Sequence, residues 1–105
     1  MEKQYGKISA VSFGRNTDRP FIFGLELTLS GKNWGTFTSI SANTSDNCMW
    51  EADERNAAFF EVCKKINKLL EDANVNSVNE LVGIPVEVTF EGNTLKDFRV
   101  FTEVL

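Results

Sequence analysis

Apolar and polar residues alternate along the first third of the chain. In the segment 21–29, FIFGLELTL, one side carries Phe21, Phe23, Leu25, Leu27 and Leu29, and the other carries Ile22, Gly24, Glu26 and Thr28. A period of two is typical of a strand with one buried face. The segments 7–13 and 34–40 have a similar composition, and the short connection SGKN at 30–33 can close a hairpin. The pattern predicts three consecutive antiparallel strands.

The period changes to that of a helix over residues 54–73. The apolar stripe of this helix contains Phe59, Val62, Cys63, Ile66, Leu69, Leu70 and Ala73. Its outer surface is charged, with lysines spaced to pair with acidic residues: Glu61, Lys64, Lys65, Lys68, Glu71 and Asp72. Asn74 is suited to a left-handed cap after the helix. Ser77 and Glu80 predict a capping box at the start of a short second helix, which Gly83 would end.

Two further strands are predicted at 85–90 and 94–104. Their inward residues are Val86, Val88 and Phe90 in the first, and Phe98, Val100 and Thr102 in the second. The order of three strands, a helix and two strands indicates an α+β fold, a five-stranded, mostly antiparallel sheet with one amphipathic helix packed on one face. With 105 residues, of which 42% are hydrophobic, the chain fits a single domain over residues 1–105.

One helix can cover only one face of such a sheet. Apolar residues at alternate positions are expected on the other face: Ile22, Phe37, Phe101, and either Val11 or Phe13. An exposed apolar patch of that size is uncommon in monomers. We expect a second copy to cover it in a symmetric dimer, through this face or through the edge of the third strand, or the loop 41–50 to cover it with Trp50.

The composition removes several classes of function. The chain has no histidine, which excludes Ser-His-Asp and Cys-His catalysis. Cys48 and Cys63 match neither a disulfide framework nor a zinc site, so both are expected to be reduced thiols. The net charge of −4 provides no basic surface for a phosphate backbone, and no segment resembles a signal peptide or a membrane span. We expect a cytoplasmic protein without catalysis or cofactor, and without direct contact to nucleic acid or membrane.

The segment DNCMWEADER, residues 46–55, surrounds a tryptophan with acidic residues at the predicted start of the helix. Carboxylates are favoured there by the free backbone amides and the helix dipole. Alternatively, these carboxylates could bind a hard cation, although the segment does not contain a calcium-loop pattern. Trp50 either packs on the first helical turn or serves as an anchor for a partner. Arg15 and Arg19 of GRNTDRP either contact a partner or are surface residues of a mobile loop. The candidate partner-binding residues are Arg15, Arg19, Asp46, Trp50, Glu51, Asp53 and Glu54.

Three segments carry a resemblance to a known group of proteins. Residues 8–14, the triplet Gly35-Thr36-Phe37, and FFEVCKKINKLLEDANVNSVNELVGIPVEV at 59–88 resemble small accessory proteins of about 100 residues from tailed phages and prophages. Such proteins often occupy a surface on a host defence complex, and anti-CRISPR proteins are among them. The resemblance therefore implies a non-catalytic inhibitor that covers a host protein or ribonucleoprotein defence complex in the bacterial cytoplasm.

A second hypothesis belongs to a different class of function. Trp34, Trp50 and Phe37 could stack on a nucleotide whose phosphates are held by Arg15, Arg19 or Lys32. The segment GRNTDRP matches no glycine-rich phosphate loop. An enzyme with a metal held by Asp46, Glu51 and Glu54 is a third hypothesis, with less support from the sequence.

Overall fold

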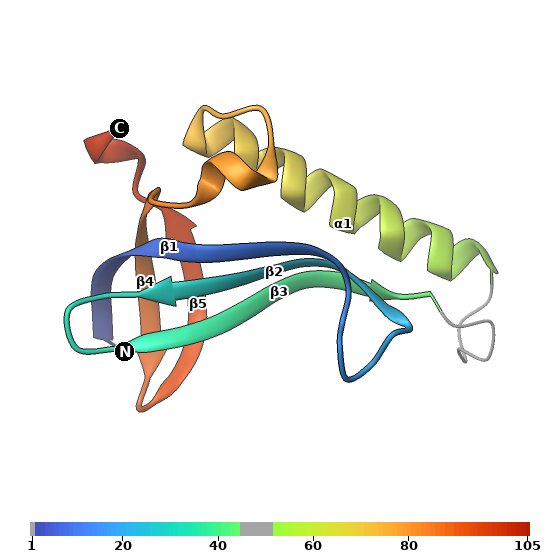
Figure 1. Ribbon diagram of the computed structural model, residues 1–105, viewed down its shortest axis with the longest axis horizontal. Helices are drawn as coiled ribbons and strands as arrows, with labels where there is room; N and C mark the ends of the chain where they lie inside the picture. The colour runs from blue at the N-terminus through green and yellow to red at the C-terminus, as the bar shows by residue number, and fades with distance from the viewer. Residues whose placement is uncertain (1, 45–51) are drawn as a thin grey trace.

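The structure, a computed structural model, describes residues 2–44 and 52–105, and the side chains of residues 52 and 53 are not described (Figure 1). The strands are β1 (Glu2–Arg15), β2 (Ile22–Ser30), β3 (Gly35–Asn43), β4 (Pro85–Glu91) and β5 (Thr94–Val100), and the helices are α1 (Ala52–Ala73) and the short 3-10 helices η1 (Val78–Leu81) and η2 (Thr102–Val104). This order confirms the predicted α+β fold with five strands and one long helix.

The sheet has the strand order β3-β2-β1-β4-β5, and every neighbouring pair is antiparallel. The central strand β1 pairs with β4 through residues 2–7 and with β2 through residues 7–15. The register shifts at a bulge between Ile8 and Ala10. The predicted strand at 7–13 was too short because residues 2–6 lack apolar alternation and are held by main-chain pairing with β4.

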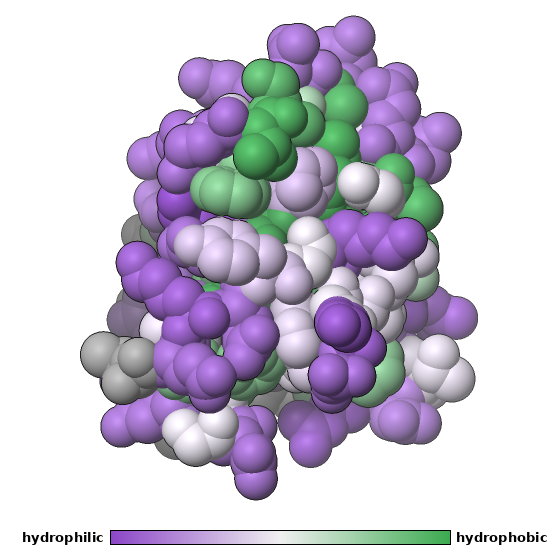
Figure 2. Space-filling view, turned by 90° about the vertical axis from the view of Figure 1, so that its left-hand side faces the viewer, coloured by the Kyte–Doolittle hydropathy of each residue, from purple (hydrophilic) through white to green (hydrophobic). Residues whose placement is uncertain are grey.

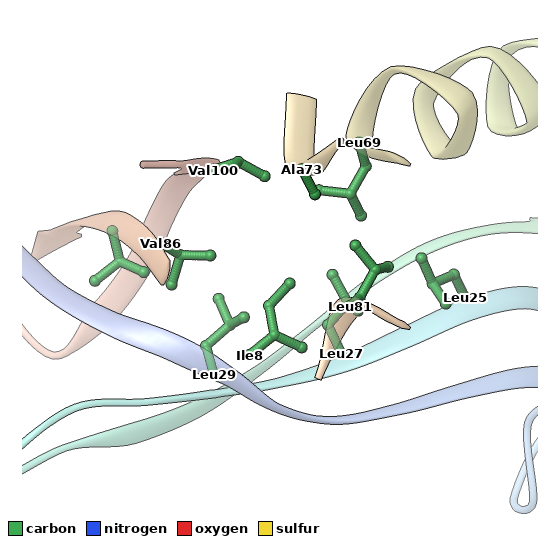
Figure 3. Close-up of a cluster of buried hydrophobic side chains, with 10 residues drawn as sticks. Ile8, Leu25, Leu27, Leu29, Leu69, Ala73, Leu81, Val86 and Val100 are labelled. Atoms are coloured by element: carbon green, nitrogen blue, oxygen red, sulfur yellow. The ribbon is translucent and has the colours of Figure 1, made fainter. Parts of the chain in front are cut away.

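The core lies between the sheet and α1. Leu25, Leu27 and Leu29 of β2 are at most 1% exposed and point toward the helix side, where Leu69 and Ala73 of α1 meet them (Figure 3). The other members of the buried cluster are Ile8, Leu81, Val86, Val88 and Val100. The five strands, α1 and η1 therefore enclose one core, and the predicted inner face of strand 21–29 is confirmed for its three leucines.

The register assigns each strand residue to a face, because directly opposed residues share one. Val11 lies opposite Leu27 and Phe13 opposite Leu25, so both are on the helix side. Their predicted position on the other face is wrong. The reason is the bulge before Ala10, which shifts the alternation of β1 by one residue after Ile8.

The face opposite α1 carries Phe37, which is paired with Thr28 and 79% exposed. Ile22 lies on the same face, but its partner Asn43 is six residues along β3 from Phe37, about 20 Å away. Phe101 lies beyond the end of β5 and packs on Tyr5 of β1, with ring centroids 5.0 Å apart. The three apolar residues predicted on this face therefore do not form one continuous patch.

The segments after the helix follow the predictions only in part. Asn74 has the predicted left-handed conformation, with a φ of 57°. The capping box does not form: the carboxylate of Glu80 accepts hydrogen bonds from the Ser77 hydroxyl and the Asn76 backbone amide, both at 3.2 Å. The predicted strand 94–104 ends at Val100, because residues 102–104 form η2 instead. The Phe101 amide donates a last hydrogen bond to the Pro85 carbonyl of β4 (2.9 Å) before this turn.

The β2–β3 hairpin is closed by a half-buried tryptophan. The Trp34 ring packs edge-on against Phe90 of β4, with centroids 5.4 Å apart, and lies directly over Gly6 and Gly31. The Gly31 amide donates a hydrogen bond of 3.0 Å to the Trp34 carbonyl. A residue predicted to begin a strand thus connects the hairpin to β1 and β4.

Candidate partner-binding surface

The residues predicted to bind a partner gather, where they are described, at one end of the molecule. Arg15 ends β1 and Arg19 lies in the connection to β2, at the right-hand end of Figure 1, where α1 also begins. Glu54 lies in the first turn of α1 and is exposed. The remaining predicted residues, Asp46, Trp50, Glu51 and the side chain of Asp53, lie outside the described part of the chain.

Three aromatic rings from three elements meet at this end. Phe13 of β1 contacts Phe23 of β2 edge-on, with centroids 5.2 Å apart. Phe23 in turn faces Phe59 of α1 at 6.4 Å. Phe13 is 52% exposed and Phe59 is 41% exposed, so the cluster is open to solvent on both sides of Phe23. We call this cluster of Phe13, Phe23 and Phe59 the aromatic end.

Two residues of the predicted apolar stripe of the helix are more exposed than predicted. Phe59 belongs to the predicted apolar stripe of the helix, yet the first turns of α1 leave it partly uncovered, whereas Val62, one turn further, is buried. Cys63, also assigned to the stripe, is an exposed free thiol. The signal that could have revealed the aromatic end is the concentration of phenylalanine at positions 13, 21, 23, 59 and 60.

The loop between β1 and β2 is held in one shape by Asn16. Its side-chain oxygen accepts hydrogen bonds from the backbone amides of Asp18 and Arg19, both at 2.9 Å, and its amide nitrogen donates to Glu26 at 2.8 Å. This is the local geometry of an Asx turn. The loop that carries Arg19 is therefore built on defined side-chain contacts at its base.

Arg15 and Arg19 are both exposed. Arg15 lies directly opposite Phe23 in the β1–β2 ladder and so shares its face with the aromatic end. Within residues 2–44 and 52–105, no ion pair is formed by Arg15 or Arg19. Aromatic residues and arginine are among the residue types that carry most of the binding energy at protein interfaces.

The opposite face of the sheet carries a charged network whose groups satisfy one another. Arg99 of β5 contacts the carboxylate of Glu87 on β4 (3.2 Å) and that of Glu103 in η2 (2.6 Å). Hydrogen bonds from Arg99 lower the pKa of Glu87 and bring the pKa of Glu103 to about 2. Both carboxylates therefore stay ionised well below neutral pH, and the network ties η2 to the sheet rather than offering a proton donor.

The residues of the nucleotide hypothesis do not form one pocket. Arg15 lies opposite Phe23 at the start of β2, whereas Lys32 follows Ser30 at its other end, more than about 20 Å away. Trp34 is half-buried against Phe90, and Trp50 is outside the described residues. Nor do any three His, Cys, Asp or Glu side chains within the described ranges lie close enough together to hold a metal ion.

The other end of the molecule, with the β2–β3 hairpin and the C terminus, faces the viewer in Figure 2. Apolar surface gathers in the upper part of this view, and the lower part is mainly hydrophilic. Val104 and Leu105 at the C terminus are 60% and 58% exposed. None of the helices in the described part of the chain combines the length and the apolar character of a membrane span.

Comparison with protein-family models, curated proteins and solved structures finds no match for this chain. Among the described residues, the features typical of a binding surface lie at the aromatic end. Exposed aromatic rings lie there next to the β1–β2 loop held by Asn16, and Arg15 and Arg19 form no ion pair with another described residue.

Proposed function

We propose that this chain is a non-catalytic binding protein that attaches to another protein through the aromatic end. The observation that carries the proposal is the open ring cluster of Phe13, Phe23 and Phe59, with Arg15 on the same face of the sheet and Arg19 in the adjoining loop. Neither arginine has an ion-pair partner among the described residues. Aromatic and arginine side chains are enriched where binding energy concentrates at protein interfaces. The complementary patch on the partner is apolar at its centre and acidic at its rim.

The partner we propose is a component of a bacterial immune complex in the host cytoplasm. This step follows the resemblance to small phage accessory proteins and does not rest on the geometry. Binding there would act by occlusion, because a protein of 11.8 kDa seated on a functional surface excludes the substrate from it. The absence of histidine supports a mode of action without catalysis.

Affinity capture from bacterial lysates tests the binding site. The parent chain, Phe59→Ser and Phe60→Ser are immobilised in parallel. Phe60 is the matched control because it is also exposed, at 57%, but its ring lies near Lys64 and in no ring contact with the aromatic end. We expect the parent and Phe60→Ser to retain the same host component and Phe59→Ser to lose it. If all three chains retain the host component equally, the binding site does not include the aromatic end.

The biological role is tested by plaque assays in hosts that carry or lack individual defence systems. Expression of the parent chain should raise phage plating only where a system is present, and Phe59→Ser should remove that effect. If the parent chain retains no host component and raises phage plating on no host that carries a defence system, the proposed function is refuted.

A further inference from the structure

The two edges of the sheet differ in how they are protected. Edge strand β5 carries Lys96, Asp97 and Arg99, and its ladder with β4 contains a register shift. Edge strand β3, GTFTSISAN, has nine residues in unbroken register with β2 and contains no charged residue and no proline. Charges, prolines and bulges are the usual means by which proteins prevent edge strands from pairing. Strand β3 is the edge that lacks them.

A groove of about 300 Å³ runs between this edge and α1. Its strand side is formed by Ser39, Ile40 and Ser41, and its helix side by Ala58, Glu61, Val62 and Lys65. Glu61 and Lys65 are one helical turn apart. Lys65 forms no ion pair within residues 2–44 and 52–105, and Glu61 contacts only the exposed Lys64, at 3.6 Å.

We propose that a second copy of this chain occupies the groove, with the two β3 strands antiparallel about a two-fold axis at Ser39. The axis places each Ser39 opposite its counterpart and each Phe37 opposite the small Ser41 of the second copy, and it joins the two sheets into one. No charged residues oppose each other in this ladder.

The charge pattern of α1 favours a second copy of this chain, rather than a strand of an unrelated protein, as the occupant of the groove. The two-fold axis brings the two helices together in opposite directions along the groove, on the same face of the joined sheet. Glu61 of one copy then faces Lys65 of the other, twice, because the two residues are one turn apart on the same side of the helix. None of Phe13, Phe23 and Phe59 lines the groove, so the proposed dimer and the proposed function are tested by different substitutions.

Light scattering during size-exclusion chromatography tests the inference. The parent should have twice the chain mass of 11.8 kDa, about 23.6 kDa, at micromolar concentrations. Ser39→Lys should elute as a monomer, because it sets two lysines against each other at the axis, and its circular dichroism should match the parent. A monomeric parent, or a Ser39→Lys dimer, would overturn the inference. If the parent is monomeric and still captures a host component, only this inference fails and the proposed function stands.

A charge exchange tests the helix contact and its register. Glu61→Lys should weaken the dimer roughly tenfold, because two attractive pairs become repulsive. The double variant Glu61→Lys with Lys65→Glu should recover the parent dissociation constant. Failure of the double variant to recover it would contradict the proposed axis.

Disulfide formation gives a test that does not depend on a disruptive substitution. In a Cys48→Ser, Cys63→Ser background, Ser39→Cys should form a covalent dimer on mild oxidation, because directly opposed antiparallel residues lie within disulfide reach. Thr28→Cys, one strand inward on β2, is the control and should stay uncrosslinked. Equal cross-linking of both variants would show random collision and refute the proposed pairing.

Discussion

Replacing Gly6 by alanine tests how the Trp34 ring joins the hairpin to the centre of the sheet. A Cβ at residue 6 would lie 2.7 Å from Cζ2 of Trp34 and would collide with the backbone carbonyl of Ser30. Carbon atoms in contact are normally about 3.5–4.0 Å apart, so the ring must retreat by about 1 Å. The Ser30 carbonyl cannot retreat easily, because residue 30 is held in the β1–β2 ladder opposite Lys7.

The expected cost follows from these two contacts. Overpacking a well-filled site costs about 1–3 kcal/mol, and the reduced freedom of alanine in the unfolded chain returns about 0.4–1 kcal/mol. Because one of the two obstacles is backbone, we expect a net loss near 2 kcal/mol. In a domain of this size that loss lowers the melting temperature by roughly 8–16 °C.

Urea and thermal unfolding followed by circular dichroism measure the effect. The control is Gly35→Ala at the start of β3, where the new Cβ would meet only the Leu29 carbonyl, at an ordinary 3.9 Å. This variant should be as stable as the parent or more stable by about 0.4–1 kcal/mol. If Gly6→Ala and Gly35→Ala unfold at the same urea concentration, the close packing of Trp34 over β1 is refuted.

Three further measurements probe the core, the charged network and the nucleotide hypothesis. Leu27→Ala should lose about 2–5 kcal/mol in urea unfolding, because Leu27 is 1% exposed and its removal leaves a cavity; a loss below 1 kcal/mol would contradict the described core. The paired Glu103 has a pKa of about 2 in the folded chain, against an ordinary value of 4.5. Its contribution to stability is therefore complete above pH 4.5 and is lost as the pH falls through 2, so Glu103→Gln should be less stable than the parent at neutral pH, by a margin that shrinks as the pH falls toward 2. A nucleotide panel should leave the melting temperature unchanged, whereas a ligand at a hundredfold excess over its Kd would add about 2.7 kcal/mol and revive the nucleotide hypothesis.

The sequence by itself determined the elements and their order. The alternation of Leu25, Leu27 and Leu29 identified a strand with one buried face, and the helical spacing of Val62, Leu69 and Ala73 identified the inner side of α1. These predictions succeeded because the two periods, two for a strand and 3.6 for a helix, are properties of the local backbone. For the same reason the left-handed residue after the helix could be recognised from Asn74 alone.

Tertiary structure decided which strands pair and which apolar side chains stay exposed. Strand β1 is the centre of the sheet because it pairs with both β2 and β4, and the bulge after Ile8 turns Val11 and Phe13 to the helix side. The exposure of Phe59 depends on where α1 crosses the sheet, and the burial of Trp34 depends on a glycine in a distant strand. A single chain segment contains no information about such contacts, because they arise only when elements far apart in the sequence compete for the same surface. The proposed function depends on the aromatic end, and the proposed dimer depends on the open edge of β3. Both features are therefore set by the tertiary packing.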